Sequence, residues 1–143
     1  RQAAIIMATL ATAYVASHFF RAANVTIGLD LMRDLGIGPE ALGALTGAFF
    51  FGFSAMQIPC GFLFDRYGPR RVQAVLLSIA GIGAAVFACA DDLSWLVIGR
   101  ALIGLGVAAA LMAGLKALVL WWPAERIALA NGWLIALGTL GAV

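Results

Sequence analysis

Charge is scarce in this sequence. Only 11% of the 143 residues are Asp, Glu, Lys or Arg, whereas 64% are hydrophobic, and the mean hydropathy is +1.02. Water-soluble domains carry about 25% charged and 45–50% apolar residues, so the composition excludes a soluble domain and predicts a membrane protein. The formal net charge of +2 is too small to indicate binding to nucleic acid.

Cysteine is equally sparse. Cys60 precedes an Arg-rich turn, and Cys89 ends the next apolar run beside Asp91 and Asp92, so the two thiols are expected at opposite sides of a bilayer. A disulfide needs Cα atoms within about 7 Å, and both cysteines are therefore expected to be free. The chain also lacks the patterns of a metal cluster, a nucleophile elbow or a phosphate-binding glycine loop, so no catalytic residue, metal or cofactor is predicted.

Long apolar runs are abundant, and short polar turns separate them. About 20 apolar residues cross a bilayer as a helix, so the length suffices for about five such helices. By hydropathy their expected bounds are residues 3–20, 40–63, 72–90, 95–122 and 127–143. The turns at 65–71 and 123–126 are expected in the cytoplasm, because short loops that carry Lys and Arg stay on that side.

The first apolar run leads into a polar helix face. Tyr14, His18, Arg21 and Val25 follow an i, i+4, i+7, i+11 spacing and share this face. An ionisable side chain at membrane depth is a candidate for function. Arg21 either binds an anion in a wet cavity, where its planar fork suits a carboxylate or phosphate, or extends to the headgroups. His18 either carries a proton or is a hydrogen-bonded packing residue.

The second and fourth runs contain further candidates. Gly43 and Gly47, four residues apart, predict a close contact between helices. Arg100 lies near the outer end of the fourth run and has two interpretations, a functional residue or a structural partner of the loop near Asp91. Lys116 lies near the inner end and is interpreted as a gate or headgroup residue, with substrate contact as the alternative.

The turn between the second and third runs carries the most specific motif. Residues 61–71 read GFLFDRYGPRR, and this pattern resembles the signature loop of the major facilitator superfamily of secondary transporters. The resemblance implies an all-α transmembrane protein with the major facilitator fold. It also implies that the residues matching the motif form a conformational latch between the two halves of the transporter: Gly61, Asp65, Arg66, Gly68, Arg70 and Arg71.

The superfamily has twelve transmembrane helices, so the resemblance implies that residues 1–143 are the first five helices of the N-terminal six-helix bundle and that the remainder is missing. In this family the first helix continues past an Arg such as Arg21, which extends the first expected span to residues 3–32. The partners implied are a small-molecule substrate, a coupling ion, the lipid bilayer and the missing C-terminal half, without nucleic acid.

Other segments resemble particular branches of the superfamily. Residues 20–24, with Tyr14 and His18, resemble the first helix of the anion:cation symporters and organophosphate:phosphate antiporters. This implies that Arg21 grips the anionic group, and it makes Tyr14, His18 and Asn24 candidate cavity residues. The alternative for Tyr14 and Asn24 is hydrogen bonding between helices.

Two more segments bear on coupling or gating. Residues 121–126 resemble the inner turn of the same branches and contribute Glu125 and Arg126. Residues 100–106 resemble the fourth-helix motif of proton-coupled members and contribute Arg100, with Lys116 as a further candidate. Together these resemblances imply an inner-membrane, multi-pass secondary transporter of a small organic anion that works by alternating access, coupled to protons or sodium.

Two alternatives remain open at this point. The first is a proton-coupled efflux antiporter for drugs or metabolites, which Arg100 favours. The second is a membrane sensor or scaffold that keeps the fold without transporting.

Overall fold

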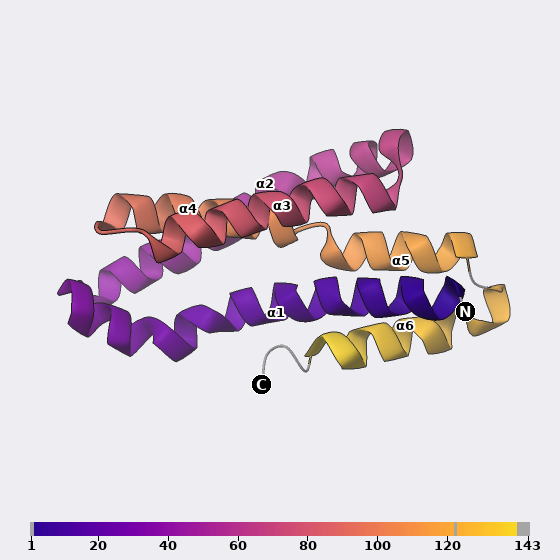
Figure 1. The fold of residues 1–143 in the computed structure, drawn as a ribbon, viewed down its shortest axis with the longest axis horizontal. Helices are drawn as coiled ribbons and strands as arrows, with labels where there is room; N and C mark the ends of the chain where they lie inside the picture. Colours follow the sequence, from indigo (N-terminus) through magenta and orange to yellow (C-terminus); the bar gives the residue numbers. More distant parts are fainter. Residues whose placement is uncertain (1, 122, 140–143) are drawn as a thin grey trace.

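The computed structural model describes the backbone of residues 2–121 and 123–139, and the side chains of these residues except 2–10, 23–26, 29, 35 and 121. This part of the chain forms six α-helices and no strand. They are α1 (Gln2–Leu35), α2 (Pro39–Tyr67), α3 (Pro69–Ala88), α4 (Leu93–Val107), α5 (Ala110–Trp121) and α6 (Ala124–Thr139). All six lie roughly along the long axis of the molecule (Figure 1). Three helical segments are long and apolar enough to cross a membrane: Pro39–Tyr67, Pro69–Ala88 and Leu93–Leu120.

The tight turns follow from local chemistry. Gly68 joins α2 to α3 with a φ of 78°, a conformation that costs glycine little. Its N–H donates to the Phe64 carbonyl at 3.1 Å, and Pro69 occupies the first position of α3, where its missing N–H is not needed. At the other end of the molecule, the Asp92 carboxylate caps α4 by accepting from the Trp95 N–H at 3.0 Å.

The fourth expected span, 95–122, is not one continuous helix. Residues 108 and 109 form a turn that separates α4 from α5, and residues 107–110 are all buried. The Ser17 hydroxyl donates to the Val107 carbonyl at 3.5 Å. This contact gives the last carbonyl of α4 a partner on α1, outside its own helix.

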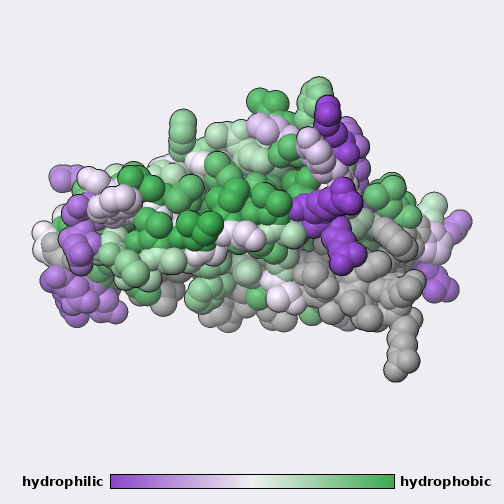
Figure 2. All heavy atoms as spheres, turned by 45° about the horizontal axis from the view of Figure 1, so that its top comes forward, coloured by the Kyte–Doolittle hydropathy of each residue, from purple (hydrophilic) through white to green (hydrophobic). Residues whose placement is uncertain are grey.

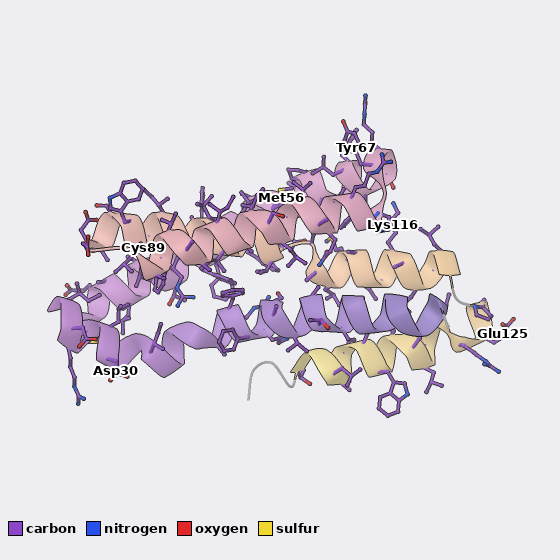
Figure 3. The ribbon with its side chains drawn as sticks, viewed as in Figure 1. Asp30, Met56, Tyr67, Cys89, Lys116 and Glu125 are labelled. Atoms are coloured by element: carbon purple, nitrogen blue, oxygen red, sulfur yellow. The ribbon has the colours of Figure 1, made fainter. Side chains whose placement is uncertain are left out.

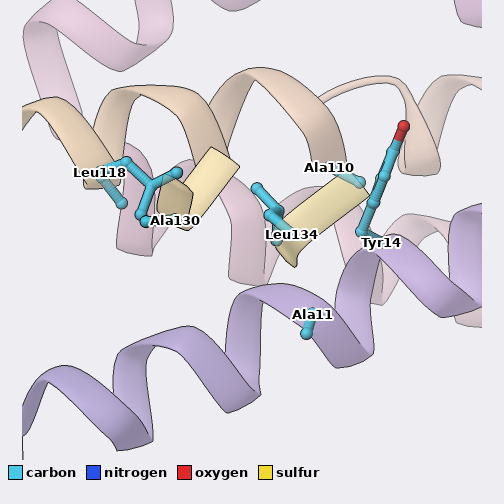
Figure 4. Close-up of a cluster of buried hydrophobic side chains, with 7 residues drawn as sticks. Ala11, Tyr14, Ala110, Leu118, Ala130 and Leu134 are labelled. Atoms are coloured by element: carbon cyan, nitrogen blue, oxygen red, sulfur yellow. The ribbon is translucent and has the colours of Figure 1, made fainter. Parts of the chain in front are cut away.

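The helices pack in two groups. α4 packs closely against α2 and α3, and α1 packs mainly against α6 and α5. Figure 4 shows the core of the second group, in which α1, α5 and α6 meet. Its buried residues are Ala11, Tyr14, Ala110, Ala117, Leu118, Ala130 and Leu134.

Glycines permit the close packing of α4. Gly52 of α2 lies against the backbone of α4, and Gly83 of α3 lies against Gly99 of α4, so that a Cβ atom at any of these positions would clash. Gly43 and Gly47, from which the sequence predicted a close contact, have no atom of the described residues within 4 Å of the position of a Cβ. Within this part of the chain, the close contact of α2 is made at Gly52 and not at the predicted pair.

The surface is largely apolar. Figure 2 shows hydrophobic residues across the middle of the molecule and hydrophilic residues gathered toward its ends. Phe51, Ile58 and Phe62 on α2 are 75%, 86% and 84% exposed. Such a surface suits contact with lipid chains, in which apolar side chains need not be buried.

Candidate functional site

A cavity of about 310 Å³ lies between α1, α2 and the turn that joins α4 to α5. On α1 and on α2 its residues have i, i+3, i+7 spacing, so that one face of each helix lines it. The lining residues are Tyr14, Ser17 and Arg21 of α1, Phe50, Phe53 and Gln57 of α2, and Val107, Ala108 and Leu111 around the turn.

The cavity lies near the middle of the bundle. Arg21, Phe53 and Val107 each lie fourteen residues from the end of their helix, at the same end of the molecule. At a rise of 1.5 Å per residue this distance is about 21 Å. The hydrocarbon core of a bilayer is about 30 Å thick, so in helices that cross a bilayer such a position is far from both helix ends.

Arg21 lies in the lining of this cavity. Its guanidinium carbon is 5.1 Å from the centroid of the Phe53 ring, a cation–π contact. Among the side chains that the structure describes, the one ion pair joins Asp65 and Lys116, so Arg21 has no carboxylate partner there. The Phe53 ring packs against one face of the guanidinium, and no described carboxylate neutralises the charge of Arg21.

The other predicted residues of the first helix have different surroundings. Tyr14 lines the cavity, and its hydroxyl points away from α1 (Figure 4). His18 does not line it: its Nδ1 donates to the Tyr14 carbonyl at 3.2 Å, and its ring packs edge-on against the Tyr14 ring at 4.5 Å. The His18 side chain therefore packs within its own helix. The side chain of Asn24 lies outside the described residues.

Seven of the nine lining residues were not among the predicted site residues: Ser17, Phe50, Phe53, Gln57, Val107, Ala108 and Leu111. On α2 the signal was the spacing of Phe50, Phe53 and Gln57, which places an amide on the same face as two aromatic rings. The sequence alone predicted no role for Gln57. Without knowledge of which face of α2 meets α1, the amide could not be assigned to a cavity.

Arg100 is buried outside the cavity. Its Nη1 donates to the Phe20 carbonyl at 3.0 Å, and its guanidinium carbon lies 4.6 Å from the centroid of the Phe87 ring. Its Nε has no partner among the described residues. The expected alternative partner, the loop near Asp91, is therefore not the one observed. Arg100 instead ties α4 to α1 at the residue that precedes Arg21.

The signature loop meets the end of the fourth expected span that carries Lys116. Lys116 of α5 donates to the carboxylate of Asp65 on α2, so a predicted latch residue pairs with a predicted gating residue. The pair lines a groove of about 380 Å³ between the two helices. Of the remaining motif residues, Arg66 lies over the ring of Tyr67, with its guanidinium carbon 5.7 Å from the ring centroid.

The other motif and turn residues lie on the surface at this end. Figure 3 shows Tyr67, Lys116 and Glu125 at one end of the molecule and Asp30 and Cys89 at the other. Five of these residues lie near the helix ends beside the two turns and are exposed: Gly61 of α2, Arg70 and Arg71 of α3, and Glu125 and Arg126 of α6. Gly68 is half-buried. Both cysteines are free, as predicted, with Cys60 buried and Cys89 exposed.

Comparison with known proteins identifies the family. Residues 10–143 match the model of the Major Facilitator Superfamily. The chain belongs to this superfamily. As an all-α superfamily member with an apolar surface, it is a multi-pass membrane protein, which explains the exposed phenylalanines of α2.

Several curated transporters of the superfamily are similar to the chain. The "Probable sulfoacetate transporter SauU" of Cupriavidus necator is 30% identical over 110 residues, which are 76% of this chain and 26% of that protein. The "Gallate transporter" of Pseudomonas putida is 30% identical over 120 residues, 79% of this chain and 25% of that protein. The "Hexuronate transporter" of Escherichia coli is 27% identical over 139 residues, 97% and 32% respectively. The chain therefore spans about a quarter to a third of these superfamily members.

Proposed function

We propose that this chain is part of a secondary transporter that moves small organic anions across a bacterial inner membrane by alternating access. The observation that carries the proposal is the position of Arg21. Its guanidinium lies in a cavity near the middle of the bundle, supported by the Phe53 ring and without a carboxylate partner among the described side chains.

Electrostatics favour an anionic ligand at this position. A cation at the centre of a bilayer costs several kcal/mol unless it is paired or hydrated. For a group at mid-depth the nearest headgroups would be about 15 Å away, which disfavours the alternative in which Arg21 extends to them. A carboxylate or phosphate that binds the guanidinium fork offsets this cost.

The similar proteins support the same class of substrate. Their names specify sulfoacetate, gallate and hexuronate, which are all organic anions. The proposal for this chain takes from them the class of ligand and not its identity. The alternative of an efflux antiporter gains nothing from the structure, because Arg100 is hydrogen-bonded to the Phe20 carbonyl and does not line the cavity.

In the proposed mechanism, two halves of the complete transporter alternate between states that open the cavity to one side of the membrane and then to the other. The Asp65–Lys116 pair would stabilise one state, as the latch at the signature loop. The Arg-rich turns at 65–71 and 123–126 would lie in the cytoplasm. None of the described carboxylates lines the cavity.

Ligand stabilisation of the purified full-length transporter tests the proposal. Organic anions, neutral sugars and lipophilic cations are compared by thermal shift in the wild type, Arg21→Ala, Arg21→Lys and Arg33→Ala. Arg33 is exposed at the end of the same helix and serves as the matched control. One class of anion should stabilise the wild type and Arg33→Ala.

For Arg21→Ala the affinity should fall about 10- to 100-fold, since a hydrogen bond to a charged group contributes about 1.5–3 kcal/mol. The affinity of Arg21→Lys for the anion should lie between those of the wild type and Arg21→Ala, because an ammonium keeps the positive charge but lacks the planar fork of a guanidinium. Stabilisation by lipophilic cations alone, or by anions to the same extent in Arg21→Ala, would refute the proposal.

A further inference from the structure

The cavity has two chemically different ends. Arg21 is the one charged residue among the nine that line it, and the neutral hydrogen-bonding residues are Tyr14, Ser17 and Gln57. All three lie on the same side of Arg21, toward the Arg-rich turns, because α1 and α2 run in opposite directions. Ser17 and Tyr14 lie about 6 and 10 Å from the level of Arg21 along α1.

Gln57 lies at the neutral end. It is four residues beyond Phe53, so its backbone lies about 6 Å along α2 from the ring that supports Arg21. The Ser17 hydroxyl, at the same level of the cavity, already donates to the Val107 carbonyl. Gln57 has no hydrogen bond to any of the described residues, and its amide offers two donors and one acceptor to a ligand.

Resting on the proposed function, we infer that the site selects monoanions that carry a neutral hydroxylated tail, and that Gln57 recognises the tail. A hydroxyl both donates and accepts, so it can pair with either side of the amide. An apolar tail would leave the half-buried amide of Gln57 without a hydrogen-bond partner, and this would lower the affinity for such a ligand. Among the described residues no second cation lines this end of the cavity, so a second anionic group would lose its hydration there without compensation.

A preference for hydroxylated monoanions would distinguish between organic anions that all belong to the proposed class of substrate. Sulfoacetate carries an anionic group at each end, whereas a hexuronate carries one carboxylate and several hydroxyls. A second, similar protein from Escherichia coli is named "Probable L-galactonate transporter", for a ligand of the same hydroxylated type. The polar groups of this cavity match the sugar acids and not the dianion.

Three six-carbon acids test the inference on the full-length transporter. Galactonate is the hydroxylated monoanion, hexanoate is a monoanion without hydroxyls, and galactarate is the hydroxylated dianion. Affinities are measured by calorimetry for the wild type, Gln57→Leu, Gln57→Arg and Gln73→Leu. Gln73 is the matched control, a buried glutamine on α3 that does not line the cavity.

The wild type and Gln73→Leu should bind galactonate at least about 10-fold more tightly than hexanoate or galactarate. In Gln57→Leu the affinity for galactonate should fall about 10-fold while that for hexanoate stays the same. Gln57→Arg should reverse the preference toward galactarate. A lost affinity for both monoanions alike in Gln57→Leu would show a structural role and would overturn the inference.

The failures of the two proposals are distinguishable with Arg21→Ala. If binding of the acids requires Arg21 but the ratio of galactonate to hexanoate affinity is unchanged in Gln57→Leu, only the inference about the tail fails. If the acids bind Arg21→Ala as tightly as the wild type, the proposed anion site fails as well. Binding of none of the three acids by the wild type would overturn the inference about the tail, whereas the proposed anion site would still be decided by the thermal-shift comparison with Arg21→Ala.

Discussion

The close approach of α3 to α4 at Gly83 gives a sharp prediction for stability. A Cβ atom at Gly83 would lie 2.8 Å from the Ile103 nitrogen and 2.9 Å from the Gly99 carbonyl oxygen. Both are backbone atoms, so no side-chain rotation can relieve the clash. The two helices would have to separate by roughly 0.6 Å to reach ordinary contact at 3.4 Å. Such overpacking costs about 1–3 kcal/mol.

Gly81, two residues earlier on α3, supplies the control. A Cβ atom there would have no atom of the described residues within 4 Å. Both Gly→Ala substitutions gain the same helix propensity, up to about 1 kcal/mol, so this contribution cancels in the comparison. Gly83→Ala should therefore be about 1–3 kcal/mol less stable than Gly81→Ala.

The measurement is the unfolding of the full-length protein in mixed micelles, followed by circular dichroism as the denaturing detergent is increased. The free energies of unfolding of Gly83→Ala and Gly81→Ala are compared under the same conditions. Equal values for the two variants would refute the reasoning, because they would mean that α3 and α4 do not pack through this glycine in the folded protein.

Two further predictions concern the ends of the molecule. Asp65→Asn and Lys116→Gln should each slow transport in proteoliposomes while changing the free energy of unfolding by less than about 1 kcal/mol, since the two side chains are 77% and 33% exposed. Exchange of the two charges should restore part of the rate, and a normal rate in Asp65→Asn would count against a latch. In intact cells, a membrane-impermeant maleimide should label the exposed Cys89 and leave the buried Cys60 unmodified. With Cys89 replaced by Ser, an Arg66→Cys variant should not react with the reagent. Labelling of this variant from outside the cell would show that the topology is the reverse of the expected one.

The class of the protein could be predicted from the sequence because lipid imposes a simple requirement. Runs of about 20 apolar residues satisfy the bilayer without any tertiary information. The signature motif added the family, and the resemblance also implied that the first helix continues past Arg21. In the structure α1 does so, from Gln2 to Leu35.

The details that depend on contacts between helices could not be predicted. The turn at residues 108 and 109 lies in a run of alanines without Gly or Pro, so no local signal marks it. The glycine contacts of α4 involve Gly52 and Gly83 and not Gly43, because the face of α2 that meets α4 is set by the whole bundle. The bond from Arg100 to the Phe20 carbonyl joins residues 80 positions apart, which spacing along the chain cannot indicate.

The two faces of α2 have consequences for how the protein can diversify. The backbone of α2 at Phe49 and Gly52 lies against the backbone of α4, so that a Cβ atom at Gly52, or at Gly104 of α4, would clash. Phe50 and Gln57 lie on a neighbouring face and line the cavity. Substitutions on the cavity face therefore leave the glycine contacts intact, whereas substitutions on the α4 face disturb the bundle. If the cavity binds the ligand as proposed, a change of ligand therefore requires substitutions at only a few positions of α2, and the packing of α2 against α4 is left unchanged.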